Sequence, residues 1–189
     1  MSSGGADGSG EAGDITLGVA IAIPQPHATV LTNLRRDVGD PSADLIWPHV
    51  TLLPPTPVPV ERMTAIDAHL AAAARASRPF VMHLSGTGTF RPVSPVVFVQ
   101  VAQGLSNCEL LERTVRTGPL ERTLDFPYHP HVTVAQDIED AGLDRAFNGL
   151  SDFVARFPVN HFVLFSRDED CRWQWRTEYL LGGAENTGG

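Results

Sequence analysis

Two identical tetrapeptides hold the residues best suited to chemistry in this chain. Pro-His-Val-Thr occurs at residues 48–51 and again at residues 130–133, so the two histidines stand 82 positions apart. Average residue usage gives such an exact repeat by chance on the order of once in a thousand chains of this length. Duplication or a shared function explains the repeat better than chance does.

Each motif pairs an imidazole with a hydroxyl. Side chains two positions apart on a β-strand point to the same face, so His49 is expected beside Thr51 and His131 beside Thr133. Near neutral pH one imidazole can take a proton from an attacking water or hydroxyl, while the other gives a proton to the leaving oxygen. Threonine hydroxyls can donate to the non-bridging phosphate oxygens, where negative charge builds up. The four residues together favour phosphodiester cleavage.

Hydrophobic periodicity predicts the elements that position the motifs. Strands are expected at 15–23, 45–53, 79–90, 96–102, 128–136, 157–166 and 173–181, and helices at 26–38, 60–77, 105–118 and 138–150. Pro54 and Pro55 are expected to end the second strand, and the last two strands to form a hairpin. The second half repeats elements of the first, which indicates an α+β fold with one motif in each half.

Composition restricts the class of protein. The apolar content of the 189 residues, 42%, predicts a single folded domain over residues 14–181, between disordered tails at 1–13 and 182–189. The sequence has no signal peptide and no apolar run of membrane-spanning length, so we expect a cytoplasmic protein that does not enter a membrane. A formal charge of −8 argues against binding duplex DNA. The chain contains no lysine, which excludes mechanisms that need one, such as a lysyl-adenylate.

Paired His-x-Thr motifs on hydrophobic strands, about eighty residues apart, resemble the two-histidine (2H) phosphoesterase superfamily. Within it, Pro-His-Val-Thr-Leu is similar to the bacterial 2′-5′ RNA ligase family and to cyclic phosphodiesterases. The resemblance implies a bilobed α+β fold of two similar halves, with antiparallel sheets flanked by helices and a central groove. It implies that His49 and His131 are the catalytic pair, that Thr51 and Thr133 bind phosphate, and that no metal or cofactor is needed. The expected partner is a nucleotide or RNA terminus with a cyclic or 2′-5′ phosphate, bound by a monomer.

Four further residues are candidate substrate contacts. Phe90 and Tyr128 stand at the ends of predicted strands, where aromatic rings can stack on a base. Arg91 follows at a turn and could clamp a phosphate, and His129 shares a strand face with His131. Core packing is the alternative for Phe90, and exposure to solvent is the alternative for Arg91 and His129.

Two other functions fit the same residues. A non-catalytic module could use the groove to hold nucleotide or RNA ends, although binding alone does not require two titrating groups. A metal-dependent hydrolase would use His49, His129 and His131 as zinc ligands, but their spacing is not diagnostic and the threonines would have no role. A two-histidine phosphodiesterase that works without a metal is the preferred hypothesis.

Overall fold

A computed structural model describes residues 13–182 of the chain. The tails predicted at 1–13 and 182–189 lie outside this range, except for Gly13 and Gly182. No helix within the range is long and apolar enough to cross a membrane. The elements are β1 (Asp14–Ala22), α1 (His27–Asp37), β2 (His49–Pro59), η1 (Val60–Arg62), α2 (Met63–Ala76), β3 (Phe80–Thr89), β4 (Val96–Gln103), α3 (Leu105–Val115), η2 (Gly118–Leu120), β5 (His131–Gln136), α4 (Asp140–Gly149), β6 (Val154–Val159), β7 (His161–Arg167) and β8 (Trp173–Leu180).

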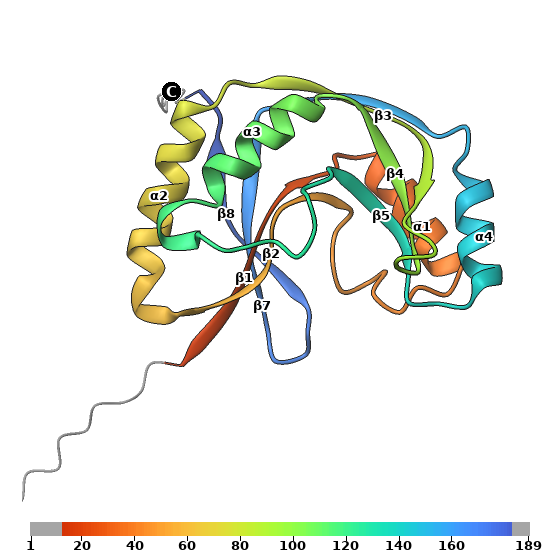
Figure 1. The fold of residues 1–189 in the computed structure, drawn as a ribbon, viewed down its shortest axis with the longest axis horizontal. Helices are drawn as coiled ribbons and strands as arrows, with labels where there is room; N and C mark the ends of the chain where they lie inside the picture. The colour runs from red at the N-terminus through yellow and green to blue at the C-terminus, as the bar shows by residue number, and fades with distance from the viewer. Residues whose placement is uncertain (1–12, 183–189) are drawn as a thin grey trace, which may run out of the picture.

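The strands form one antiparallel sheet in the order β6-β3-β4-β5-β2-β1-β7-β8. The two motif strands, β2 and β5, are central neighbours, but they join at a single pair, Val50 opposite Val132. The sheet therefore divides into a first lobe (β2, β1, β7, β8) and a second lobe (β5, β4, β3, β6), which lie side by side in Figure 1. This confirms the expected bilobed α+β fold.

Helices α1 and α3 each pack against a strand of the lobe to which their neighbours in the chain do not belong. The order β1-α1-β2-α2 is repeated by β4-α3-β5-α4, as the internal repeat predicts. Helix α1 joins two strands of the first lobe but packs against β5, whereas α3 joins two strands of the second lobe but packs against β2. Helix α2 packs beside α3, and α4 packs against β3, β4 and β5 (Figure 1). Each lobe is thus covered by a helix that belongs to the other half, which holds the motif strands together.

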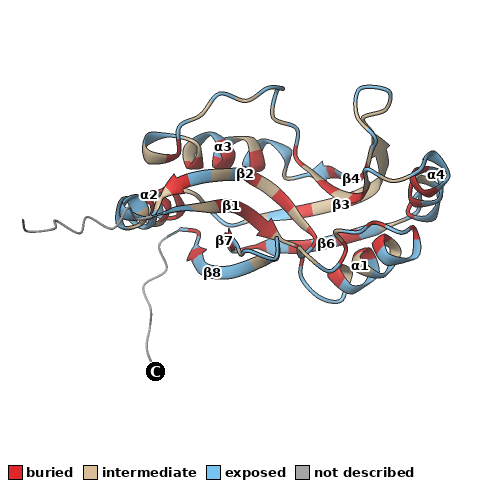
Figure 2. Ribbon diagram, turned by 90° about the horizontal axis from the view of Figure 1, so that it is seen from below, coloured by how far each residue is buried: buried red, intermediate tan, exposed pale blue. Residues whose placement is uncertain are grey.

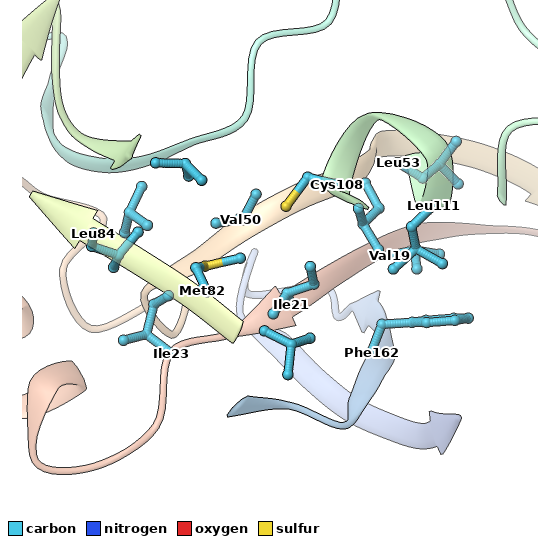
Figure 3. Close-up of a cluster of buried hydrophobic side chains, with 14 of the residues drawn as sticks. Val19, Ile21, Ile23, Val50, Leu53, Met82, Leu84, Cys108, Leu111 and Phe162 are labelled. Carbon is cyan, nitrogen blue, oxygen red and sulfur yellow. The ribbon is translucent and has the colours of Figure 1, made fainter. Parts of the chain in front are cut away.

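The buried side chains decide which face of the sheet the motifs use. Val50 and Val132, the middle residues of the motifs, are fully buried on the helix-covered face. Cys108 and Leu111 of α3 pack there, close to Val19 and Val50 in Figure 3, and Figure 2 shows the helices buried where they face the sheet. Burial of a valine stabilises the fold by roughly 1.5–3 kcal/mol. A shift of the strand register by one residue would turn these valines to the other face and lose this burial. The register is therefore fixed, and the histidines and threonines lie on the face opposite to the valines.

Strand β2 continues to Pro59, and the prediction that Pro54 and Pro55 end it is wrong. The register with β1 shifts between Leu17 and Val19, so both prolines lie in a β-bulge. Residues in a bulge do not take part in the ladder of hydrogen bonds. A proline, which has no backbone N–H group, therefore breaks no hydrogen bond at this position. The sequence shows the prolines but not the bulge that accommodates them.

The prediction of one strand over 157–166 is also wrong. Strand β6 ends at Val159 and pairs with β3 in the second lobe, whereas β7 begins at His161 and pairs with β1 and β8 in the first. The chain crosses between the lobes at Asn160. Because the apolar residues continue on both sides of this crossing, periodicity alone did not mark it. The expected terminal hairpin is confirmed as β7-β8.

Candidate active site

Strands β2 and β5 bring the two motifs together. Their middle valines lie directly opposite each other in an antiparallel pair. Continuing this register places His49 opposite Thr133 and Thr51 opposite His131. The motifs are therefore related by an approximate two-fold axis through the valine pair, and each imidazole has the other motif's hydroxyl as its cross-strand neighbour.

Both catalytic candidates are held in the same way by the backbone. Nδ1 of His49 lies 2.6 Å from the carbonyl oxygen of Trp47, and Nδ1 of His131 lies 2.6 Å from that of His129. A carbonyl oxygen can only accept a hydrogen bond, so in the neutral ring Nδ1 donates its proton and Nε2 carries the lone pair. The bond fixes the tautomer that a general base needs, and it does so identically in both motifs.

Both imidazoles favour the neutral form. Burial lowers the pKa of His49 to about 4, against the opposing effect of the Trp47 carbonyl, and the charges of Arg35 and His131 lower it further. Burial also lowers the pKa of His131, although its bond to the His129 carbonyl acts in the opposite direction. The charge of His131 acts on His49, since the pairing of β2 with β5 brings the two motifs together. At neutral pH each presents a lone pair for proton transfer.

The motifs lie where three pockets meet. The first-lobe pocket, of about 350 Å³, is lined by His49, Thr51 and Thr133. The second-lobe pocket, of about 540 Å³, is lined by His131 and Thr133. A third pocket, of about 360 Å³, is lined by Thr51 and His131. Because the threonines are shared between pockets, the three form one groove with the four motif residues at its centre, which suits a phosphate with groups on more than one side.

Aromatic side chains surround His131. The Phe90 ring meets it edge to face, with 5.0 Å between ring centroids, and Phe98 lies 5.1 Å away. His129 is 5.7 Å from Phe90, and both line the second-lobe pocket. Phe90 and His129 therefore lie beside the candidate site. The sequence analysis missed Phe98, whose position became evident only from the pairing of β4 with β5.

Comparison with known proteins agrees with this geometry. The family model of the 2′-5′ RNA ligase superfamily matches residues 23–170, a range that contains both motifs. The chain belongs to the 2′-5′ RNA ligase superfamily. This confirms the resemblance to 2H phosphoesterases that the repeated motif indicates.

Relatives of the superfamily match along nearly their whole length. A Bacillus cytotoxicus protein with a provisional phosphoesterase name is 28% identical over 168 residues, which cover 88% of this chain and 96% of that protein. Escherichia coli LigT complexed with 3′-AMP matches with a TM-score of 0.64 and 22% identity, covering 89% of this chain and 98% of LigT. LigT complexed with NADP+ gives a TM-score of 0.66 at 22% identity, covering 89% and 99%. These structures share the fold, and the family and the relatives' names support a phosphoesterase.

Tyr128 connects the two motifs of this superfamily member. Its hydroxyl donates to the backbone carbonyl of Thr51 at a distance of 2.9 Å, and the residue lines the third pocket. Burial raises the pKa of Tyr128, so the hydroxyl stays protonated and able to donate. The bond ties the loop before the second motif to the strand of the first, and the base stacking predicted for Tyr128 stays a prediction.

Arg91 is held by helix α4. Its guanidinium lies 2.8 Å from a carboxylate oxygen of Asp144 and 3.7 Å from one of Asp140. Arg91 does not line any of the three pockets of the groove. The structure thus places this predicted phosphate clamp in an ion-pair cluster beside the second lobe.

A buried ion pair supports the loop that leads into His49. Nε of Arg35 lies 3.0 Å from a carboxylate oxygen of Asp40, and both side chains are almost wholly inaccessible. Arg35 also donates to the Ser42 hydroxyl at 2.6 Å and to the Ile46 carbonyl at 3.4 Å. Arg35 lines the first-lobe pocket, so its charge acts on the site. The sequence analysis missed this network, since nothing in the residue pattern marks which arginine of α1 is buried.

The zinc alternative lacks a suitable ligand set. Within residues 13–182, no group of three or more His, Cys, Asp or Glu side chains is arranged to hold a metal ion. The three histidines considered as ligands, His49, His129 and His131, do not form such a group. The geometry instead gives each motif histidine a backbone carbonyl as the partner of Nδ1.

Proposed function

We propose that this protein hydrolyses a 2′,3′-cyclic phosphate or a 2′-5′-linked nucleotide or RNA ester by acid-base catalysis from His49 and His131, without a metal ion. The observation that carries the proposal is the matched pair of imidazoles, each fixed through Nδ1 so that Nε2 has the lone pair. A nucleotide substrate is also in keeping with the LigT structure that contains 3′-AMP.

Hydrolysis of a cyclic phosphate proceeds in one displacement. Thr51 and Thr133 donate hydrogen bonds to the non-bridging oxygens, which carry the developing charge. His49 takes a proton from the attacking water through Nε2 as the new P–O bond forms. His131, in its protonated form, gives a proton to the ribose oxygen as the opposite P–O bond breaks and its electron pair leaves with that oxygen. The product is a phosphomonoester, and exchange with solvent restores both histidines.

The electrostatics favour His49 as the base in this step. Burial, with a smaller contribution from the positive charge of Arg35, lowers the pKa of His49, so the lone pair is available well below neutral pH. His131 has no arginine among the charges that shift its pKa. Bound phosphate, with its negative charge, raises the pKa of His131 and favours the protonated form that an acid needs.

The pH dependence of kcat/KM tests the proposal. For adenosine 2′,3′-cyclic phosphate we expect a bell-shaped profile with its maximum between pH 4 and pH 6.5. Activity is lost as pH falls through the His49 pKa of about 4, because the base becomes protonated. It is also lost as pH rises through the His131 pKa, which lies below its usual 6.5, because the acid loses its proton.

Initial rates from about pH 3 to 8 at constant ionic strength give this profile. A maximum above about pH 7 would contradict the assigned pKa shifts. Absence of hydrolysis at every pH would contradict the proposed function itself.

A further inference from the structure

Three arginines line a pocket outside the groove. This outer pocket, of about 980 Å³, is lined by the end of α3 and by the loop 121–130, which leads from η2 to β5 (Figure 1). The four motif residues do not line it. Arg113 lies in the last turn of α3 and Arg116 directly after the helix, whereas Arg122 belongs to the loop. A chain with a formal charge of −8 thus gathers three positive charges around one pocket.

The folded chain neutralises one of these three charges. Arg116 forms an ion pair with Glu112, one turn earlier on α3. Within residues 13–182, Arg113 and Arg122 form no ion pair. Two guanidinium charges at the pocket therefore have no counter-charge in the described part of the chain. The acidic residues that line the pocket are exposed and form no ion pair in that same range: Glu121 and Asp125.

The guanidinium of Arg122 also lacks an acceptor. Its Nη1 donates to Oγ1 of Thr56 at 2.8 Å and to the carbonyl oxygen of Pro55 at 3.3 Å, which ties the loop to β2. Its Nε is enclosed and has no hydrogen-bond partner among the described residues. An enclosed donor without an acceptor lowers stability, so an acceptor from outside the chain stabilises this site. Residues 121–130 form no helix or strand, and a small shift of this loop can admit the acceptor.

The chemistry of the lining favours a phosphate group as that acceptor. A guanidinium binds phosphate oxygens through two parallel hydrogen bonds. The two charges without a counter-ion match the charge of a phosphate monoester near neutral pH, which is close to −2. A carboxylate carries one negative charge and would leave one guanidinium uncompensated. The hydroxyl of Thr123 lies in the same lining and adds a neutral donor.

We propose that the outer pocket binds a phosphate group, free or as a monoester, through Arg113, Arg116 and Arg122. The site is distinct from the groove at the motifs, and its loop connects the two. The loop 121–130 lines both the outer pocket and the third pocket of the groove. It also carries Tyr128, whose hydroxyl binds the backbone of the first motif. A phosphate in the outer pocket therefore restrains a loop that the groove uses as well.

Titration calorimetry with inorganic phosphate at pH 8 tests the site. Thr51→Val and Thr133→Val are introduced together to remove the phosphate donors of the groove, while both motif histidines are uncharged at this pH because their pKa values are lowered. Arginine keeps its charge. We expect this double variant to bind one phosphate per chain. Adding Arg122→Gln should raise Kd roughly 10- to 150-fold, as expected for the loss of a charge-assisted hydrogen bond.

Arg113→Gln is an independent variant, because its side chain is exposed and the fold does not depend on it. It removes one of the two unpaired charges and should raise Kd at least about five-fold. Arg145→Gln, on the exposed face of α4 and outside the pocket, is the matched control and should leave Kd within about two-fold.

Glycerol 2-phosphate in the same titration distinguishes the two sources of the phosphate group. Tighter binding than that of inorganic phosphate would identify a monoester as the ligand, and weaker binding would identify free phosphate. No saturable binding of either compound to the double variant would overturn the site. Equal Kd values for Arg113→Gln and Arg145→Gln would overturn it too. Neither result would affect the proposed function, which depends on the groove.

Discussion

Alanine in place of either His49 or His131 lowers kcat for adenosine 2′,3′-cyclic phosphate by about 10²–10⁴-fold, the usual contribution of a general acid or base. Each variant loses one of the two proton transfers while the threonines still bind the phosphate. Because the partner of each Nδ1 is a solvent-side loop carbonyl and not a buried polar side chain, the fold should tolerate both changes. Steady-state rates with matched folding controls measure the effect.

His27→Ala is the matched control for these variants. The His27 ring packs near Phe153 and Phe157 and does not line the groove. This variant should keep kcat within a few-fold of wild type, roughly the effect expected for a change away from the site. A rate for His49→Ala or His131→Ala as high as that of His27→Ala would show that the histidine in question does not take part in catalysis.

Asp40→Ala lowers the free energy of unfolding by about 3–5 kcal/mol, because it leaves the Arg35 guanidinium buried without its counter-ion. The lost carboxylate also held the backbone N–H and the hydroxyl of Ser42, at 2.9 and 2.7 Å. The loop that carries these residues ends at the first motif, so we expect KM to rise as well. Urea unfolding followed by circular dichroism measures the change in stability.

The neighbouring pair supplies the control. Asp44 binds Arg36 on the surface, with both side chains more than half exposed. Solvent screens such a pair, so Asp44→Ala should cost less than about 1 kcal/mol. Equal losses for Asp40→Ala and Asp44→Ala would mean that burial of the first pair adds nothing to stability.

The fold class, and the meeting of the two motifs at the centre of the candidate site, were predictable from local patterns. The alternation of side chains along a strand predicted that Val50 and Val132 point away from the histidines and threonines, and both valines are buried. It also predicted that the His and Thr of each motif share one face. Exact repetition of the motif indicated two equivalent halves, and the pairing of β2 with β5 confirms that they meet. These features depend on residues close together in the chain, which periodicity records directly.

Features that depend on distant contacts were not predictable. Tyr128 and Phe98 owe their roles to partners in other strands, Thr51 and His131 respectively. Arg35 is buried because Asp40 and the following loop fold back over α1, and no local pattern separates it from its exposed neighbour. The same limit explains the bulge in β2 and the crossing at Asn160.

The most direct test of the central claim is hydrolysis of adenosine 2′,3′-cyclic phosphate by the wild-type protein in excess EDTA. Two imidazoles and two hydroxyls complete the proton transfers by themselves, so the rate should stay within about two-fold of that in untreated protein. A rate that falls at least about ten-fold with EDTA, and returns when zinc is added, would contradict the account and support a metal-bound nucleophile.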